Sequence, residues 1–256
     1  LLAFCTTSFS MVFATLSFWI GGNRFSHVPP GGVESIREIL SEDGIKTIIK
    51  LCILYFFIAM FFSLKGQSAS SWILQSSHMD RQLFGIEWLP SQIQVANSLL
   101  IIIMIPVFSF VVYPSINKFF YLTSLRKISI GLFITALAFV VSAWIESQIV
   151  AGKEPSIWWQ IIAYVIITSG EIMVSITCLE FSYAQSPKKM KSFVMALFFL
   201  SISFGNAFTA IVNVFIQNED GSTKLQGASY YWFFAILMTI TATIFVFVVK
   251  KYKIMI

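Results

Sequence analysis

Three ionisable side chains interrupt long apolar runs of this 256-residue sequence: Lys65, Glu171 and Glu180. Such groups are costly in hydrocarbon and usually face a cavity, a proton path or a ligand. Glu171 carries the strongest signal, because Thr168 and Ser175 stand at i−3 and i+4 and share its helix face. An acid with two hydroxyls suits a cationic ammonium or a proton carried on the carboxyl. The alternative is a protonated acid that bonds a neighbouring helix and only aids packing.

Depth in the membrane separates the two acids. Glu171 follows Trp159 by 12 residues, which at 1.5 Å per residue is roughly 18 Å, near the middle of a ~30 Å hydrocarbon core. Glu180 lies nine residues further along and, at about 100° per residue, on the opposite helix face. We therefore expect Glu180 to bond across helices near the membrane surface, in a structural role.

Lys65 and Asn97 each allow two interpretations. Lys65 stands beside Gly66 towards the end of its apolar run, so its ammonium either snorkels outward to water or forms an ion pair that opens and closes with a gate. Asn97 is a lone amide in another apolar run. Buried, it needs hydrogen-bond partners, which are either neighbouring helices or a ligand.

The composition excludes a soluble globular domain. Charged residues make up 11% and hydrophobic residues 57%, whereas soluble domains carry about 25% charged residues. The sequence therefore predicts a polytopic membrane protein surrounded by a lipid bilayer. It shows no nucleophile–base pair, metal-ligand cluster or phosphate-binding glycine loop, so we expect no enzyme activity, no metal, no cofactor and no nucleic-acid partner.

Seven apolar segments approach or reach the length of about 20 residues that a membrane-crossing helix needs. Their runs are continuous and lack the period of two that barrel strands show, which predicts an all-α fold. The tryptophans fall at or near the segment ends, as in an aromatic belt. The segments are Leu1–Ile20, Thr47–Leu64 with a polar continuation to about Gln75, Ser91–Tyr113, Ile128–Ile145, Ile157–Tyr183, Ser192–Ile216 and Tyr230–Val249.

The loop charges predict an orientation and a division of the chain. Thirteen of the 17 Lys and Arg residues lie in one set of connections and the C-terminal tail, and the positive-inside rule makes that side cytoplasmic. We expect a multi-pass protein of the cell (inner) membrane with a cytoplasmic C-terminus. One helix, a long inner connection and six further helices are typical of a two-half transporter that has been cut one helix before its central linker. The predicted parts are one helix of a first half (1–20), an inter-half linker (21–46), a six-helix second half (47–249) and a basic tail (250–256).

The linker carries its own pattern. Pro29, Pro30, Gly31 and Gly32 break helix, and residues 34–40 predict a short amphipathic helix after that break. Pro106, Gly205 and Asn206, which interrupt later spans, are expected to permit bending or a close approach of helices.

Several motifs together resemble one known family. The stretch 170–187, GEIMVSITCLEFSYAQSP, followed by Met190-Lys191-Ser192 and Gly205-Asn206, is similar to the tenth and eleventh helices of proton-coupled oligopeptide transporters (POT/PTR), which have the major facilitator fold. Residues 92–97 with Pro106 resemble the eighth helix, and residues 70–75 the seventh. Residues 18–21 and 28–32 resemble the exit from the sixth. The similarity covers essentially the whole chain, in order.

The resemblance implies a substrate site. Glu171 would hold the peptide's α-amino group, with Ser175 beside it, and Asn97 would bond the amino end or backbone. Phe198 stands where the family commonly has Trp, so an aromatic wall is kept without the indole donor. The implied substrate-binding residues are Glu171, Ser175, Asn97, Phe198, Gln67 and Phe62.

Two departures from the family pattern accompany the resemblance. Counting back from Trp72, Gly66 stands where the family usually has Asp or Glu, and Lys65 where it often has an apolar residue. The family's first five helices also have no counterpart in this chain. The resemblance therefore implies part of a proton-driven di- and tripeptide symporter, with protons as the coupling ion and the missing N-terminal half as a partner.

Two other classes remain open at this point. A facilitator-fold carrier for an amino acid or nitrate has the same helices, although a mid-span acid argues against an anionic substrate. A seven-helix membrane receptor has the same topology, although the last span contains no Lys for a retinal Schiff base.

Overall fold

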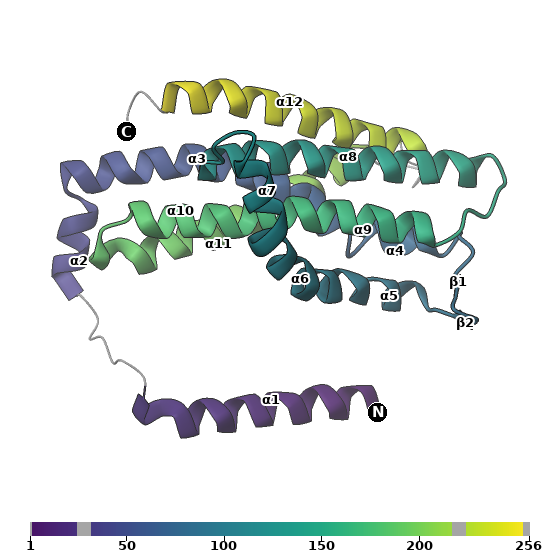
Figure 1. Cartoon of the computed structure of the whole chain (residues 1–256), viewed down its shortest axis with the longest axis horizontal. Helices are drawn as coiled ribbons and strands as arrows, with labels where there is room; N and C mark the ends of the chain where they lie inside the picture. Colours follow the sequence, from purple (N-terminus) through teal and green to yellow (C-terminus); the bar gives the residue numbers. More distant parts are fainter. Residues whose placement is uncertain (1, 25–31, 217–223, 253–256) are drawn as a thin grey trace.

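The computed structural model describes residues 2–24, 32–216 and 224–252, and these are almost entirely helical (Figure 1). The elements in chain order are α1 (Leu2–Gly21), the 3-10 turn η1 (Gly22–Arg24), α2 (Gly32–Ile39), α3 (Glu42–Gln67), α4 (Ser71–Ser76), β1 (Gln82–Leu83), β2 (Ile86–Glu87), α5 (Pro90–Ile93), α6 (Val95–Val107), the π-helical turn η2 (Phe108–Val112), α7 (Tyr113–Asn117), α8 (Ser124–Val150), α9 (Trp158–Glu171), the π-helical turn η3 (Ile172–Ile176), α10 (Thr177–Gln185), the 3-10 turn η4 (Lys188–Met190), α11 (Lys191–Ile216) and α12 (Ala228–Tyr252).

Six helical segments of the described chain are long and apolar enough to cross a membrane, which confirms the all-α polytopic fold. They are Glu42–Ser76, Pro90–Asn117, Ser124–Val150, Trp158–Gln185, Lys191–Ile216 and Ala228–Lys251. The first predicted span, Leu1–Ile20, is helical as α1. Its described apolar part, Thr7–Gly21, is shorter than a crossing helix, so a seventh span stays a prediction.

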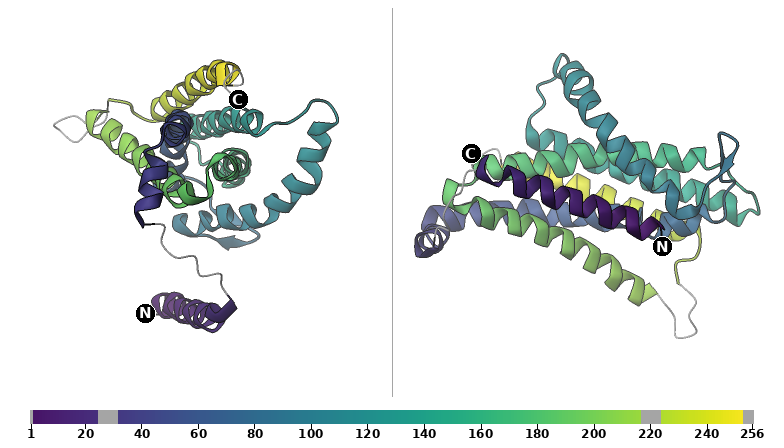
Figure 2. Two further views of the ribbon diagram at one scale, coloured as in Figure 1. Left: turned by 90° about the vertical axis from the view of Figure 1, so that its left-hand side faces the viewer. Right: turned by 90° about the horizontal axis from the view of Figure 1, so that it is seen from below.

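The bundle joins helices that are distant in sequence. α11 packs along α3, α12 along α8, and α9 against both α8 and α6. Figure 2 shows α1 lying apart from the bundle, and the arm formed by α5, α6 and α7 curving away from the other helices. The arm leaves most of its apolar side chains exposed, since only 6% of its most apolar window is buried. In a membrane, these side chains face lipid or further helices.

The main core surrounds Trp72 of α4. Its side chain is fully buried, and its ring centroid lies 5.8 Å from that of Phe139 and 5.0 Å from that of Tyr164. Gln160 Nε2 also donates a hydrogen bond to the Trp72 carbonyl at 2.7 Å. The prediction that Trp72 belongs to an aromatic belt is therefore wrong, because α8 and α9 enclose the ring.

The α3–α11 contact depends on small residues. A Cβ at Gly205 would overlap the Ala59 carbonyl oxygen and lie 2.9 Å from the Ser63 amide nitrogen. The Ser63 and Thr209 hydroxyls are 2.7 Å apart, and Thr209 Oγ1 also donates to the Ser63 carbonyl at 2.9 Å. Small and hydroxyl residues let membrane helices approach closely and bond across the contact, as expected for Gly205.

Two spans contain a π-helical turn, and the two turns pack together. Pro106 lies inside α6, and η2 follows it at Phe108. The second turn, η3, begins directly after Glu171. Phe108 forms a separate apolar cluster with Ile172 and Met173. A π-helical turn adds a residue to the helix and often marks a functional site, so the count of about 100° per residue does not carry unchanged past Glu171.

The expected amphipathic helix of the linker is present as α2, which packs against η4 and α3. Ser41 then caps α3, with its Oγ accepting from the Gly44 amide at 3.1 Å. Pro29, Pro30 and residues 253–256 of the tail lie outside the described residues.

Candidate functional site

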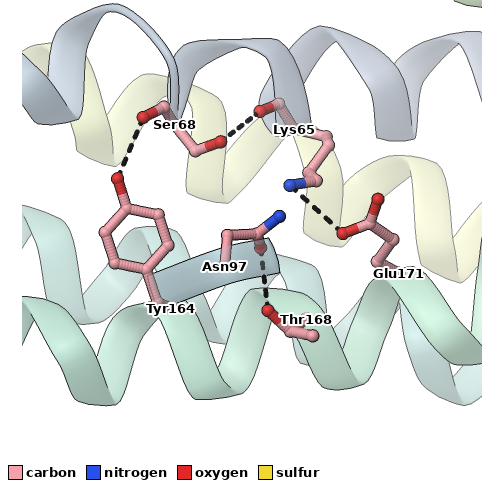
Figure 3. Close-up of polar contacts among 6 residues, drawn as sticks. All are labelled: Lys65, Ser68, Asn97, Tyr164, Thr168 and Glu171. Carbon is pink, nitrogen blue, oxygen red and sulfur yellow. Dashed lines mark hydrogen bonds and ion pairs between the residues drawn. The ribbon is translucent and has the colours of Figure 1, made fainter. Parts of the chain in front are cut away.

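Lys65 of α3 and Glu171 of α9 form an ion pair between two spans. The Nζ–Oε2 distance is 3.1 Å, and the side chains are 14% and 20% exposed. Figure 3 shows Lys65 reaching from α3 toward Glu171, with the Asn97 amide beside the pair. Glu171 Oε2 is buried and has no hydrogen-bond partner among the described residues. The two groups are therefore held by charge at short distance, without a well-directed hydrogen bond.

The ion pair decides between the two interpretations of Lys65. The structure directs the Lys65 ammonium toward α9 and leaves only 14% of the side chain exposed, so the snorkelling interpretation is wrong. The partner, Glu171, belongs to the same bundle of described helices as Lys65 itself. The pair therefore forms without any residue from another half.

Gly66 faces α11, whereas the neighbouring Lys65 reaches α9. A Cβ at Gly66 would overlap Oδ1 at the end of the Asn206 side chain of α11, so a larger residue at position 66 would require that side chain to move. Successive residues of an α-helix are about 100° apart. Lys65 consequently turns toward α9 when Gly66 packs on α11.

Asn97 of α6 is tied to α9 one turn before the acid. Thr168 Oγ1 donates a hydrogen bond to Asn97 Oδ1 at 2.8 Å. Thr168 is fully buried and Asn97 is partly exposed. The hydrogen bond uses the amide oxygen and leaves the amide NH2 available, which Figure 3 shows pointing toward Lys65 and Glu171. Asn97 therefore both joins two helices and presents donors at the ion pair.

A second set of hydrogen bonds fixes the end of α3. Tyr164 OH donates to the Ser68 carbonyl at 3.0 Å, and Ser68 Oγ donates to the Lys65 carbonyl at 2.8 Å (Figure 3). Tyr164 lies on α9, two turns before Glu171. These bonds hold the backbone of Lys65 relative to the helix that carries its partner. Ser68 and Tyr164 were not predicted as site residues, because neither position stands out in the sequence pattern.

Three further predicted site residues, Phe62, Gln67 and Phe198, lie on α3 and α11. The rings of Phe62 and Phe198 are 6.0 Å apart, and Tyr55 lies 6.0 Å from Phe198 on the other side. Phe198 is 4% exposed. Gln67 is buried, and its Nε2 donates to the Ser63 carbonyl at 3.2 Å. Their assignment to a substrate cavity stays a prediction.

Ser175 and Glu180 follow the π-helical turn. Ser175 lies inside η3 and is partly exposed, and Glu180 is exposed on α10. The wider turn changes the rotation between Glu171 and both residues, so their relation differs from the one that a regular helix predicts. The roles expected for Ser175 and Glu180 stay predictions.

Comparisons with known proteins place this helical arrangement in a family. The family model described as the POT family matches residues 34–233. Peptide transporter PTR2 of Saccharomyces cerevisiae is 36% identical over 179 residues, which cover 64% of this chain and 29% of that protein. Solute carrier family 15 member 1 of Mus musculus is 42% identical over 106 residues, which cover 41% of this chain and 15% of that protein.

Solved structures agree with the family match. The POT family transporter PepTSo is 33% identical, with a TM-score of 0.76, and the match covers 83% of this chain and 43% of that one. An auto-inhibited POT family peptide transporter is 31% identical, with a TM-score of 0.75, over 82% of this chain and 42% of that one. The chain thus spans less than a third of the curated relatives named above and less than half of these solved chains. The POT family model matches most of the length of this chain, so the chain belongs to the POT family of membrane transporters.

Proposed function

We propose that this chain supplies the C-terminal half, with one preceding helix, of a proton-driven symporter for di- and tripeptides. Family membership and the names of its relatives as peptide transporters support the substrate class. The observation that carries the proposal is the Glu171 carboxylate, which is partly exposed and charge-paired inside the predicted membrane span. An intramembrane acid of this kind is costly unless it serves a ligand or a proton.

Glu171 binds the α-ammonium of the peptide in this proposal. An ammonium offers three hydrogen-bond donors, and a carboxylate only accepts. Glu171 Oε2 makes no directed hydrogen bond and lies 3.1 Å from the Lys65 ammonium, so the peptide ammonium takes that contact when Lys65 leaves it. The Asn97 amide lies beside it and donates to a backbone carbonyl of the peptide. Ser175, Phe198, Phe62 and Gln67 complete the site as cavity residues.

Protons serve as the coupling ion, because the negative charge of the Glu171 carboxylate can be neutralised either by binding a proton or by pairing with an ammonium group. The complete transporter works by alternating access, in which two halves rock about a central site. The N-terminal half of such a transporter is the partner of the present helices in this proposal. The excess of Lys and Arg on one set of connections supports a cell-membrane protein with a cytoplasmic C-terminus.

The test is uptake of a labelled dipeptide by cells that express the complete polypeptide carrying this sequence. We expect Glu171→Gln to lower uptake at least about tenfold, because a hydrogen bond to a charged group contributes about 1.5–3 kcal/mol. Glu180→Gln is the matched control, since Glu180 is an exposed acid on the continuing helix. Surface labelling of an external tag shows that both variants reach the membrane.

A double variant and a set of competitors distinguish a binding defect from a folding defect and from a different substrate. Glu171→Gln combined with Lys65→Met removes both charges, so a folding defect caused by an unpaired lysine is relieved while uptake stays low. Unlabelled dipeptides, free amino acids and nitrate are then compared as competitors. Wild-type uptake by Glu171→Gln, or competition by amino acids or nitrate but not by dipeptides, rejects the proposed function.

A further inference from the structure

We propose that Lys65 is a resident competitor for the substrate's ammonium. In the empty carrier its side chain occupies the amine subsite at Glu171, and the arriving peptide displaces it. This inference rests on the proposed function and deepens it, because it assigns a second residue that controls affinity and turnover. The ion pair at 3.1 Å between Nζ and Oε2 is the observation that carries it.

The chemistry of the two cations is the same. The lysine side chain and the peptide amino terminus are both primary ammonium groups with three donors and one positive charge. A carboxylate that is arranged to hold one of them is equally arranged to hold the other. Lys65 Nζ therefore stands where the substrate nitrogen must go, and the two cannot occupy the Oε2 contact together.

The geometry permits the displacement. Glu171 Oε2 has no directed hydrogen bond despite the short distance, so Lys65 leaves without breaking a hydrogen bond at that oxygen, and the arriving ammonium replaces the counter-charge of Glu171. The side chains are 14% exposed for Lys65 and 20% exposed for Glu171, although Oε2 itself is buried, so Lys65 has to move before a ligand reaches that oxygen. The lysine stem is a flexible four-carbon chain. Its backbone is fixed by the Ser68 and Tyr164 hydrogen bonds, so only the side chain has to move.

A tethered competitor raises the apparent dissociation constant. Lys65 cannot diffuse away, so it acts at the effective concentration of a short flexible linker, about the millimolar range. The peptide binds only to the fraction of carriers in which Glu171 is not paired with Lys65. Its apparent dissociation constant is the intrinsic constant divided by that fraction. Affinity for an amine-bearing substrate is therefore lower than the carboxylate alone would allow.

The same residue helps the carrier to return empty. After release, an unpaired carboxylate within the membrane would be costly to move through a closed state. Lys65 supplies the counter-charge that the departing peptide takes away. Removing Lys65 should therefore lower the KM for the peptide, because the peptide binds more tightly. It should also lower the maximal rate of net uptake, because cycling through the empty carrier becomes slower.

The experiment compares Lys65→Met with the wild-type complete transporter at mildly alkaline pH, where protons compete least for the carboxylate. We expect the KM or inhibition constant for a free-amine dipeptide to fall about tenfold, as when the competent fraction rises from roughly a tenth to nearly all. The maximal rate of net uptake falls, while exchange against internal dipeptide is kept, because exchange does not need the empty return. Lys65→Arg keeps the cation and restores a constant near that of the wild type.

Matched controls separate competition from a structural role. Lys153→Met removes an exposed cation in the connection before α9 and leaves all constants unchanged. An N-acetylated dipeptide lacks the ammonium, so Lys65→Met does not improve its binding. If Lys65→Met fails to reach the membrane, Lys65→Gln, which can still donate to Glu171, is tested as purified protein by the dipeptide-induced rise in melting temperature.

The outcomes distinguish this inference from the proposed function. An unchanged or raised constant for the free-amine dipeptide in Lys65→Met and Lys65→Gln overturns the inference while wild-type peptide uptake stands. Equal improvement for the N-acetylated dipeptide also overturns it, since the gain would then not concern the ammonium. Absence of dipeptide uptake by the wild type rejects the proposed function instead.

Discussion

Gly131 of α8 and Gly170 of α9 face each other where the two helices are closest. A Cβ on either glycine would lie 3.1 Å from the carbonyl oxygen of the other. A Cβ on Gly170 would also lie 2.5 Å from Thr135 Oγ1. Glu171 follows Gly170 directly, so this contact between two backbones sets the position from which the carboxylate reaches Lys65.

We expect Gly170→Ala to destabilise the protein by about 1–3 kcal/mol, the usual cost of inserting a methyl group into a packed contact. The measurement is thermal unfolding of the purified complete protein in detergent. Gly22→Ala is the control, because a Cβ there has nothing within 4 Å. Adding Thr135→Ala to Gly170→Ala removes the closest atom and should recover part of the loss. A wild-type melting curve for Gly170→Ala would contradict the packing assigned to this contact.

Exchanging the two charges tests whether the ion pair is only structural. Lys65→Glu with Glu171→Lys keeps opposite charges on α3 and α9 but removes the carboxylate from α9. We expect each single change to lower expression and melting temperature strongly, because an unpaired buried charge costs about 3–5 kcal/mol. The double exchange should restore both properties without restoring dipeptide uptake. Recovery of uptake to the wild-type level would show that the pair supports structure alone.

Variants of the Asn97–Thr168 hydrogen bond distinguish the two roles considered for Asn97, helix packing and ligand binding. Thr168→Val removes the donor and should reduce stability by only about 0.6 kcal/mol, the average for such bonds between membrane helices. Asn97→Ala removes the amide donors as well, and we expect it to weaken dipeptide binding in addition. Melting temperature and the KM for a dipeptide are measured for both variants. Equal KM values in the two variants would assign Asn97 to helix packing only.

Variants of Phe198 test whether its ring is packed in the protein core or lines a cavity. Its ring is 4% exposed and lies between Phe62 and Tyr55, so Phe198→Ala should cost about 3–5 kcal/mol. Phe198→Trp introduces a larger aromatic side chain and should cost about 1–3 kcal/mol if the space is filled. Thermal unfolding checks both changes. A Trp variant as stable as the wild type would show that the site has free volume, as a substrate pocket requires.

The crossing helices could be predicted because hydropathy acts locally. Each span from Glu42–Ser76 to Ala228–Lys251 contains a long, mainly apolar window, and a helix is the structure that satisfies its backbone groups within the run. The same local reasoning identified Glu171 as a costly acid, Gly205 as a point of close approach and α2 as a short amphipathic helix. None of these inferences required knowledge of which helices are neighbours.

The partners of the site residues could not be predicted in this way. The contact between Lys65 and Glu171 joins positions more than a hundred residues apart, and it depends on how α3 and α9 are rotated in the bundle. That rotation is set by Gly66 against Asn206, by Gly170 against Thr135 and by the π-helical turn after Glu171. The count of about 100° per residue from Glu171 to Glu180 did not include the wider π-helical turn between them.

The amino-acid order thus accounts for the crossing helices and for the acids within them, since the free energy of burying an apolar run depends on that run alone, but the helices extend beyond the predicted segments, as Ser124–Val150 does beyond Ile128–Ile145. The neighbour of that acid, the burial of Trp72 and the turn of Lys65 toward α9 were decided by tertiary packing. The physical reason is that rotating a helix by one residue, about 100°, changes which side chain faces a neighbour while leaving its hydropathy unchanged.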